Sequence, residues 1–233
     1  MSHESAHDPL LLLASASAGR RATLRAARIE HAVLPVDLDE EALLASTRRR
    51  AEAEGSPLTV GEQVLLLARE KAQAATSRSE GGYVVLGGDS MLELDGEPIG
   101  KPHTAEKAAR QWRAMRGRTG TLHSGHWLID DRDPADGGTG ATFGATAGCA
   151  VTFAAVSDEE IDAYVATGEP LGVAGGFTID GRAGPFITSV DGDPHAVVGL
   201  SLPLLRDLLT EIGIGVHDLW ETSASPGSAP ASA

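Results

Sequence analysis

The chain has 233 residues, of which 42% are hydrophobic and 22% are charged, and its formal net charge is −14. This length can bury a sizeable core, in one large domain or two small ones, whereas the acidic balance argues against general nucleic-acid binding, which needs a basic face to neutralise phosphates. Cys149 is the single cysteine, so no intrachain disulfide forms and a reducing compartment is the simpler interpretation.

The two ends of the chain differ in composition from the part between them. Residues 1–8 are polar and are expected to form a flexible leader, and residues 221–233 are rich in Ser, Pro and Ala and are expected to be disordered. The first apolar run, Leu10–Ala14, is too short for a signal sequence or a membrane span. We therefore expect one globular domain over residues 9–213, in a soluble cytoplasmic protein without a membrane partner.

Short apolar runs alternate with helical patterns along the first half of this domain. Thr59 and Glu62 form a capping box at the start of one helix, and Asp95-Gly96 is a hairpin signal. The predicted elements are strands at Leu10–Ala14, Ala32–Val36 and Tyr83–Leu86, helices at Arg20–Ala27 and from Val60 onward, and a hairpin at Met91–Ile99.

The second half adds further helices whose ends are marked by capping residues and glycines. Ser157 and Glu160 form a second capping box, and Gly168 ends the helix that follows. Because hairpins occur and strict βαβ alternation does not, we predict a mixed α/β fold in which helices pack on a mixed sheet. The predicted elements are helices at Thr104–Arg116, 157–167 and Leu202–Ile212, strands at Thr121–Ile129, Ala147–Val156 and Phe186–Val190, and loops at 131–141 and 175–184.

The segment LLLASASAGRRATL, residues 11–24, is a hydroxyl-rich and basic corner in an acidic chain. A strand that enters a helix through Ser15, Ser17 and Gly19 leaves backbone N–H groups free at the helix N-terminus, and Arg20 can donate two hydrogen bonds to a phosphate. The alternative is a capped strand–helix turn with exposed arginines. The Gly-Lys-Ser/Thr ending of a Walker A loop is absent.

Two acidic segments are candidates for metal binding or proton transfer. Glu40 belongs to an acidic run at 37–41 that offers the oxygen ligands preferred by Mg²⁺ and Mn²⁺; the alternative is the acidic first turn of a helix. Asp89 follows an apolar strand and two glycines, so it is expected at a rigid rim, where it could bind a metal or accept a proton from water. The alternative for Asp89 is a Gly-Asp turn.

Two lysines are suited to neutralise phosphoryl oxygens. Lys101 lies in a Gly-Lys-Pro turn after the hairpin, and Lys71 lies in a helical segment, where a solvated helix face is the alternative. His123 and His126 are expected on opposite faces of a strand, which is poor spacing for a joint metal site. We therefore interpret both histidines as structural.

An arginine turn, carboxylates and two lysines in this order are the groups expected around a metal–triphosphate. At this point the chain resembles the Maf nucleotide pyrophosphatases, once described as septum formation inhibitors. The resemblance runs from about Leu11 to Ile212. The matching segments, in order, are LASASAGR, LAREKAQA, LGGDSMLELDGEPIGKP, RAMRGRTG, SDEEIDAYVATGEP, AGGFTIDG and GDPHAVVGLSL.

The resemblance implies hydrolysis of a nucleoside triphosphate between its α and β phosphates, which removes noncanonical or modified nucleotides. It also implies a divalent cation (Mg²⁺ or Mn²⁺), a homodimer, and a long mixed sheet with two lobes around a cleft, similar to the inosine triphosphatases. Asp89 is then favoured as the proton acceptor, although Asp89 and Glu40 are also suited to hold the metal. The family's functional residues fall here on Ser15, Arg20, Glu40, Lys71, Asp89 and Lys101.

Several positions depart from the family pattern. The usual Ser-Pro-Arg-Arg core reads Ser-Ala-Gly-Arg at 17–20, so a bulky side chain that would face the base is missing at Gly19. At Gly19, Ser90 and Asp180 the chain matches neither the pyrimidine-selective nor the 7-methylguanosine branch. An ionised Asp180 only accepts hydrogen bonds, which favours a base edge rich in N–H donors, such as that of guanine. Val173 replaces a common lysine, which weakens one phosphate contact.

Two other functions stay open at this point. A non-catalytic regulator of cell division or septum formation would bind a nucleotide without turnover, but the retained carboxylates and lysines disfavour it. A nucleotidyltransferase would need a Gly-x-Gly-Thr start, which is absent. We therefore predict a nucleoside triphosphate pyrophosphatase, a hydrolase of acid anhydrides. Its predicted catalytic residues are Asp89, Lys101, Lys71 and Glu40, and its predicted substrate-binding residues are Ser15, Arg20, Gly19, Ser90 and Asp180.

Overall fold

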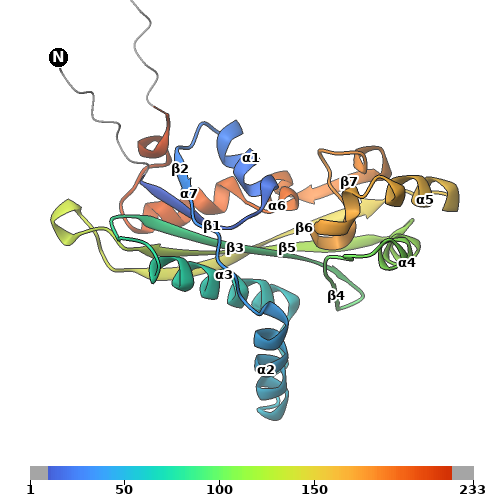
Figure 1. Cartoon of the computed structure of the whole chain (residues 1–233), viewed down its shortest axis with the longest axis horizontal. Helices are drawn as coiled ribbons and strands as arrows, with labels where there is room; N and C mark the ends of the chain where they lie inside the picture. The colour runs from blue at the N-terminus through green and yellow to red at the C-terminus, as the bar shows by residue number, and fades with distance from the viewer. Residues whose placement is uncertain (1–9, 222–233) are drawn as a thin grey trace, which may run out of the picture.

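The computed structural model describes residues 10–221, and one seven-stranded sheet organises them in the order β2-β1-β3-β5-β6-β7, with β4 paired to β3 (Figure 1). β1 is parallel to both β2 and β3, and the other pairs are antiparallel. The predicted mixed sheet is confirmed. The strands are β1 Leu11–Ala14, β2 His31–Val33, β3 Val84–Leu94, β4 Glu97–Ile99, β5 Thr119–Asp130, β6 Thr142–Phe153 and β7 Ile187–Gly192.

The helices begin at the caps that the sequence predicts. The Thr59–Glu62 and Ser157–Glu160 capping boxes are both formed, and the Thr104 side chain accepts a hydrogen bond from the backbone of Lys107. The α-helices are α1 Ala18–Ala26, α2 Glu40–Ala53, α3 Val60–Thr76, α4 Ala105–Met115, α5 Asp158–Ala166, α6 Pro194–Val198 and α7 Leu202–Glu211. The short 3-10 helices are η1 Pro134–Asp136, η2 Glu169–Gly172, η3 Ala174–Gly176, η4 Gly184–Phe186 and η5 Val216–Leu219.

The local predictions for β3 and β2 need correction, and the helices were predicted incompletely. The strand expected at Tyr83–Leu86 continues to Leu94, so the Gly-Asp turn considered for Asp89 is wrong. β3 pairs with β5 from Val84 to Glu93, and this ladder overrides the local turn preference of glycine and aspartate. β2 ends at Val33, where its pairing with β1 ends. The acidic first turn of a helix, the alternative considered for the Glu40 segment, is present at the start of α2, whose full extent was not predicted. The helix α6 was not predicted.

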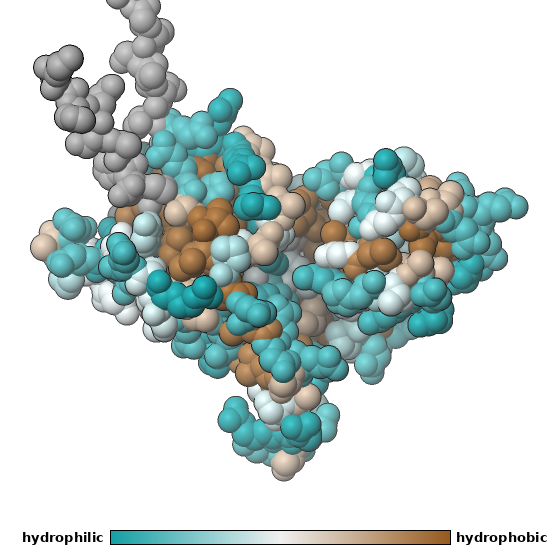
Figure 2. Space-filling view, viewed as in Figure 1, coloured by the Kyte–Doolittle hydropathy of each residue, from teal (hydrophilic) through white to brown (hydrophobic). Residues whose placement is uncertain are grey.

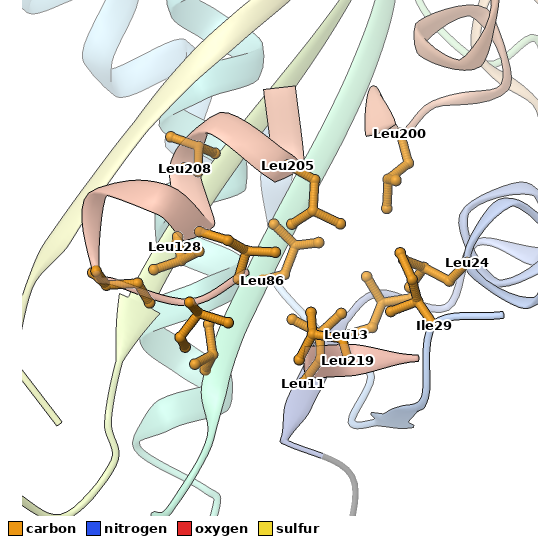
Figure 3. Packing of buried hydrophobic residues seen from close by; sticks show 14 residues of the cluster. Leu11, Leu13, Leu24, Ile29, Leu86, Leu128, Leu200, Leu205, Leu208 and Leu219 are labelled. Atoms are coloured by element: carbon orange, nitrogen blue, oxygen red, sulfur yellow. The ribbon is translucent and has the colours of Figure 1, made fainter. Parts of the chain in front are cut away.

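Helices cover both faces of the sheet, and the core is divided along the long strands. α3 lies on one face, and α1, α6 and α7 lie on the other (Figure 1). One apolar cluster joins β1, β3, β5 and α7 through leucines such as Leu11, Leu86 and Leu205 (Figure 3). A second cluster surrounds Trp112 on α4, which makes edge-to-face contacts with Phe153 and Tyr164. These clusters form two lobes, and Figure 2 shows a hollow between them.

The two predicted terminal segments lie almost entirely outside the described residues. The expected leader at 1–8 lies outside residues 10–221, and so does the expected tail except for its first residue. That residue, Glu221, is bound to Arg28 through a backbone hydrogen bond of 2.8 Å and an ion pair of 3.1 Å. Among residues 10–221, every helix is too short or too polar to cross a membrane.

Candidate functional site

A cavity of about 420 Å³ opens where the edge of β3 has no neighbouring strand. β1 pairs with β3 only up to Gly87, and β4 pairs with it again from Leu92. Over the residues between, β3 is held by β5 on its other edge alone. Asp89 and Ser90 lie in this gap and line the cavity, so the unequal lengths of β1 and β3 create the site.

The structure brings all the predicted site residues to this cavity. They come from the β1–α1 corner, the first turn of α2, the middle of α3 and β3, the turn after β4, and the loop after η3. The predicted residues that line it are Ser15, Gly19, Arg20, Glu40, Lys71, Asp89, Ser90, Lys101 and Asp180, and Val173 lines it as well.

Lys71 is held between two carboxylates. Its Nζ lies 2.6 Å from Oδ1 of Asp89 and 2.7 Å from Oε1 of Glu40. Lys71 and Asp89 are each only 8% exposed, so the solvated helix face considered for Lys71 is wrong. α3 can lie this close to the strand because Gly87 has no side chain: a Cβ there would stand 2.8 Å from the backbone nitrogen of Ala72.

Arg20 is held on the opposite face of β3, and it is only 7% exposed. Its Nε donates to the carbonyl of Gly199 at 2.8 Å, and its two terminal nitrogens donate to Ser15 Oγ at 2.9 Å and Ser90 Oγ at 3.0 Å. Three of the five guanidinium N–H groups are thus bound within the protein. Gly88 makes room for this side chain, since a Cβ there would be 3.0 Å from Nε.

The two glycines before Asp89 therefore make room for two different neighbouring groups. Successive strand residues point to opposite faces of a sheet, so Gly87 admits α3 on one face and Gly88 admits Arg20 on the other. Protein groups therefore occupy the space beside the two glycines, and the ligand space lies beyond them, at Asp89 and Ser90.

Burial lowers the pKa of the Arg20 guanidinium, and the charges of Asp89 and Glu40 oppose this effect. The guanidinium therefore stays cationic, because the ordinary pKa of arginine lies far above neutral pH. A fixed positive charge thus stands at one face of β3, and the Lys71–carboxylate group stands at the other. The fixed charge of Arg20 suits the binding of an anionic ligand, whereas the other group has one ammonium and two carboxylates and is therefore not positive overall.

The sequence pointed to Ser15 and Ser90 but not to Gly199, whose carbonyl accepts from Arg20, nor to the residues that support Ser90. Ser90 Oγ is 2.8 Å from Ser124 Oγ, which donates to the carbonyl of Ala196 at 2.8 Å. Ala196 belongs to α6, which begins with the cap Asp193 and ends at Gly199. The signal for α6 was present, since an Asp-Pro start and a glycine stop mark a short helix.

His126 of β5 links this strand to the segment after α6 through hydrogen bonds. Its Nδ1 donates to the carbonyl of Ser124 at 3.0 Å, and its Nε2 accepts the backbone N–H of Ser201 at 2.9 Å. An accepting Nε2 requires the neutral ring. Burial first, and then the charge of Arg20, lowers the pKa of His126 to about 4. The structural role predicted for His126 is confirmed.

This geometry predicts that the protein loses stability in mild acid. The unfolded chain takes up the proton on His126 near the ordinary pKa of 6.5, whereas the folded chain resists it until about 4. The free energy of unfolding should therefore fall as the pH drops through this window, by up to about 3 kcal/mol from this residue. Urea unfolding at several pH values measures this change in the free energy of unfolding. His126→Gln keeps an acceptor but does not titrate, so its unfolding free energy should fall less over the window; an equal fall in both proteins would contradict the assignment.

Gly19 lines the cavity and also makes a packing contact that the sequence did not predict. A Cβ at Gly19 would stand 2.8 Å from the carbonyl oxygen of Val198 and 3.2 Å from its side chain. The missing side chain therefore lets the first turn of α1 pack against α6. Since Val198 also lines the cavity, this contact positions part of the cavity wall.

Comparison with known proteins places these residues in a family context. A sequence profile described as Maf-like protein matches residues 10–212. The chain is 54% identical to a nucleoside triphosphate pyrophosphatase of Leifsonia xyli subsp. xyli, over 90% of this chain and 96% of that protein. It is 48% identical to one of Salinispora tropica, over 94% and 91%. Among solved structures, the Ham1 protein of Staphylococcus aureus aligns with 86% of this chain and 98% of its own, at 14% identity and a TM-score of 0.41, a similarity too weak to define the fold.

Proposed function

The chain belongs to the family of Maf-like proteins, and on that premise we propose that its cavity hydrolyses a nucleoside triphosphate to a nucleoside monophosphate and pyrophosphate. The observation that supports this most is the convergence of three cationic side chains and two carboxylates on one cavity: Arg20, Lys71 and Lys101 with Glu40 and Asp89. The relatives bear the name nucleoside triphosphate pyrophosphatase at up to 54% identity.

The positive groups suit a triphosphate. Lys101 is exposed at the cavity and presents a mobile ammonium, which neutralises phosphoryl oxygens as a point charge. Arg20 adds a fixed charge and keeps two N–H groups that its three protein bonds do not use. Ser15 and the N-terminus of α1 supply neutral donors at the same corner.

Asp89 is the carboxylate that we assign as proton acceptor. Water adds to the α-phosphorus while the bond from that phosphorus to the bridging oxygen breaks, and the proton of the water passes to Asp89. Lys71 holds one oxygen of Asp89 at 2.6 Å, which orients the carboxylate. Pyrophosphate leaves, and Lys101 and Arg20 stabilise the charge that builds on it.

Protein side chains supply only some of the ligands that a divalent cation needs at this site. Residues 10–221 hold no group of three or more His, Cys, Asp or Glu side chains arranged for a metal. Glu40 and Asp89 nevertheless converge on one cation, the ammonium of Lys71. Mg²⁺ is commonly held by one or two carboxylates together with substrate phosphates. We propose that Glu40 and Asp89 would hold Mg²⁺ or Mn²⁺ together with the substrate phosphates, where the bound cation would supply polarisation of the phosphate.

The experiment that tests the proposed function is a nucleotide panel read by product. Purified protein is incubated with Mg²⁺ or with Mn²⁺ and with natural and modified nucleoside triphosphates of both base classes. At least one of them should give the monophosphate and pyrophosphate, and metal removal by a chelator should abolish turnover. Release of orthophosphate, or binding of nucleotides without turnover under both metals, would contradict the proposal.

The wider role rests on the family resemblance. We propose that the protein removes noncanonical or modified nucleotides before they enter nucleic acid, that it acts in the cytoplasm, and that it forms a homodimer. The single cysteine, Cys149, supports a reducing compartment. A preference for modified over natural triphosphates in the same panel would support the first of these roles.

A further inference from the structure

One wall of the cavity is a loop that leaves the second lobe after η3. Phe177, Thr178, Ile179 and Asp180 all line the cavity. The cationic groups that suit the phosphates come from other elements, α1, α3 and the turn after β4. This loop instead offers a carboxylate, which repels phosphates, and the apolar side chain of Ile179. Its chemistry therefore suits the nucleoside part of a nucleotide.

Both ends of this loop are fixed in the core. At its start, the indole Nε1 of Trp112 donates to the carbonyl of Gly176 at 2.8 Å. Phe177 is buried and packs edge-to-face on Phe153, with ring centroids 5.1 Å apart. At its end, Ala183 is fully buried. These contacts do not hold the tip of the loop, residues 178–182, which must be positioned by other contacts.

The tip closes around a carboxylate that is not part of the cavity wall. Oε1 of Glu169, in η2, accepts hydrogen bonds from the hydroxyl of Thr178, from the backbone N–H of Arg182 at 2.9 Å and from the hydroxyl of Tyr164 at 3.1 Å. Thr178 precedes Ile179 and Asp180, and Arg182 follows them. One oxygen atom thus holds both sides of the tip.

The carboxylate of Glu169 is ionised at neutral pH. Burial pushes its pKa upward, but the hydrogen bonds from Thr178, Tyr164 and the backbone of Arg182 together hold the pKa below its ordinary value. Hydrogen bonds to a charged acceptor are stronger than neutral ones. The space around it is also full, since a Cβ at Gly181 would stand 2.6 Å from Oε1 and closer still to the hydroxyl of Thr178.

We propose that Glu169 is a positioning residue that sets the place of Ile179 and Asp180 in the cavity wall, and so determines the affinity for the nucleoside part of the substrate. This inference rests on the proposed function and deepens it. Glu169 acts through the loop and does not touch the reacting atoms, so its loss should affect substrate binding and leave the chemical step unchanged.

The test compares three variants by steady-state release of pyrophosphate from the best nucleotide of the panel. Glu169→Ala should raise KM about tenfold or more, with kcat within about threefold. Glu169→Gln keeps an oxygen acceptor and should stay within about threefold of the parent KM. Gly181→Ala keeps the Glu169 carboxylate but crowds both its Oε1 and the hydroxyl of Thr178, and should raise KM as Glu169→Ala does. Glu159→Ala removes an exposed carboxylate of α5 and serves as the control, with parent values.

Inorganic triphosphate has no nucleoside, so its binding reports on the phosphate-binding part of the site alone. Its inhibition constant against the best nucleotide should be the same for the parent and for Glu169→Ala. An unchanged KM in both Glu169→Ala and Gly181→Ala, or an equal loss of affinity for inorganic triphosphate, would overturn the inference. If thermal unfolding shows that Glu169→Ala does not fold, Gly181→Ala alone decides.

The failure of this inference differs from the failure of the proposed function. A parent protein that releases no pyrophosphate from any nucleotide contradicts the proposed function. Equilibrium dialysis with the same nucleotides then still tests the inference, because weaker nucleotide binding by Glu169→Ala supports it and unchanged binding contradicts it.

Discussion

Asp89→Asn should lower the rate of pyrophosphate release by about 10²- to 10⁴-fold, the range that a positioned acid or base contributes. Asparagine has nearly the same shape, but it neither accepts a proton from water nor provides a charged oxygen to Lys71 or to a cation. Because Oδ1 of Asp89 lies 2.6 Å from Nζ of Lys71, the substitution also leaves that ammonium paired with Glu40 alone. The readout is kcat for the best nucleotide, with pyrophosphate measured directly.

The matched control is a carboxylate that also pairs with a cation but lies far from the cavity. Asp162 on α5 is exposed and lies 3.0 Å from a terminal nitrogen of Arg113. Asp162→Asn should keep parent activity. Thermal unfolding of both variants shows whether the loss of activity follows from loss of the fold. A folded Asp89→Asn protein with parent activity would remove Asp89 from the mechanism.

Lys101→Ala should lower kcat/KM by about 10²- to 10³-fold, as the removal of one preorganised positive or hydrogen-bonding group at a developing charge does. Lys101 is exposed, so the substitution removes a charge from the cavity without opening a hole in the core. Its turn is held independently of the side chain, because Gln111 Nε2 donates to the carbonyl of Gly100 at 3.1 Å. The fold should therefore be unchanged.

Lys107 is a close control for this charge. It lies in the first turn of α4, it is exposed, and its Nζ is 3.4 Å from the backbone carbonyl of Lys101. Lys107→Ala removes the same charge from the same surface, yet Lys107 does not line the cavity. A loss in Lys107→Ala as large as that in Lys101→Ala would contradict the assignment of a specific phosphate contact to the Lys101 side chain.

Both predictions depend on a site divided by β3. Asp89 faces Lys71 and α3, and Ser90 faces Arg20 and α1. Since neighbouring residues of a strand point to opposite faces, two adjacent positions supply the carboxylate and a hydroxyl to different parts of one cavity. A slip of one residue in the β3–β5 register would exchange them, which is why the ten-residue ladder with β5 matters for function.

The elements that the sequence predicted well are those whose signals are local. The capping boxes at Thr59 and Ser157 and the hairpin at Asp95-Gly96 depend on contacts within a few residues. The extent of β3 was missed because Gly87 and Gly88 favour a turn locally, while their pairing with β5, about forty residues further along the chain, favours a strand.

The sequence by itself determined the chemistry that is available: which side chains could bind a triphosphate, and which family they resemble. Such information resides in residue types and in their order along the chain. Only the tertiary structure decided that Lys71 is buried between two carboxylates, that Gly19 and Gly88 make room for Val198 and Arg20, and that Glu169 holds the loop of Asp180. These contacts join residues far apart in the chain, and their geometry is set by strand pairing and close packing, which no local pattern encodes.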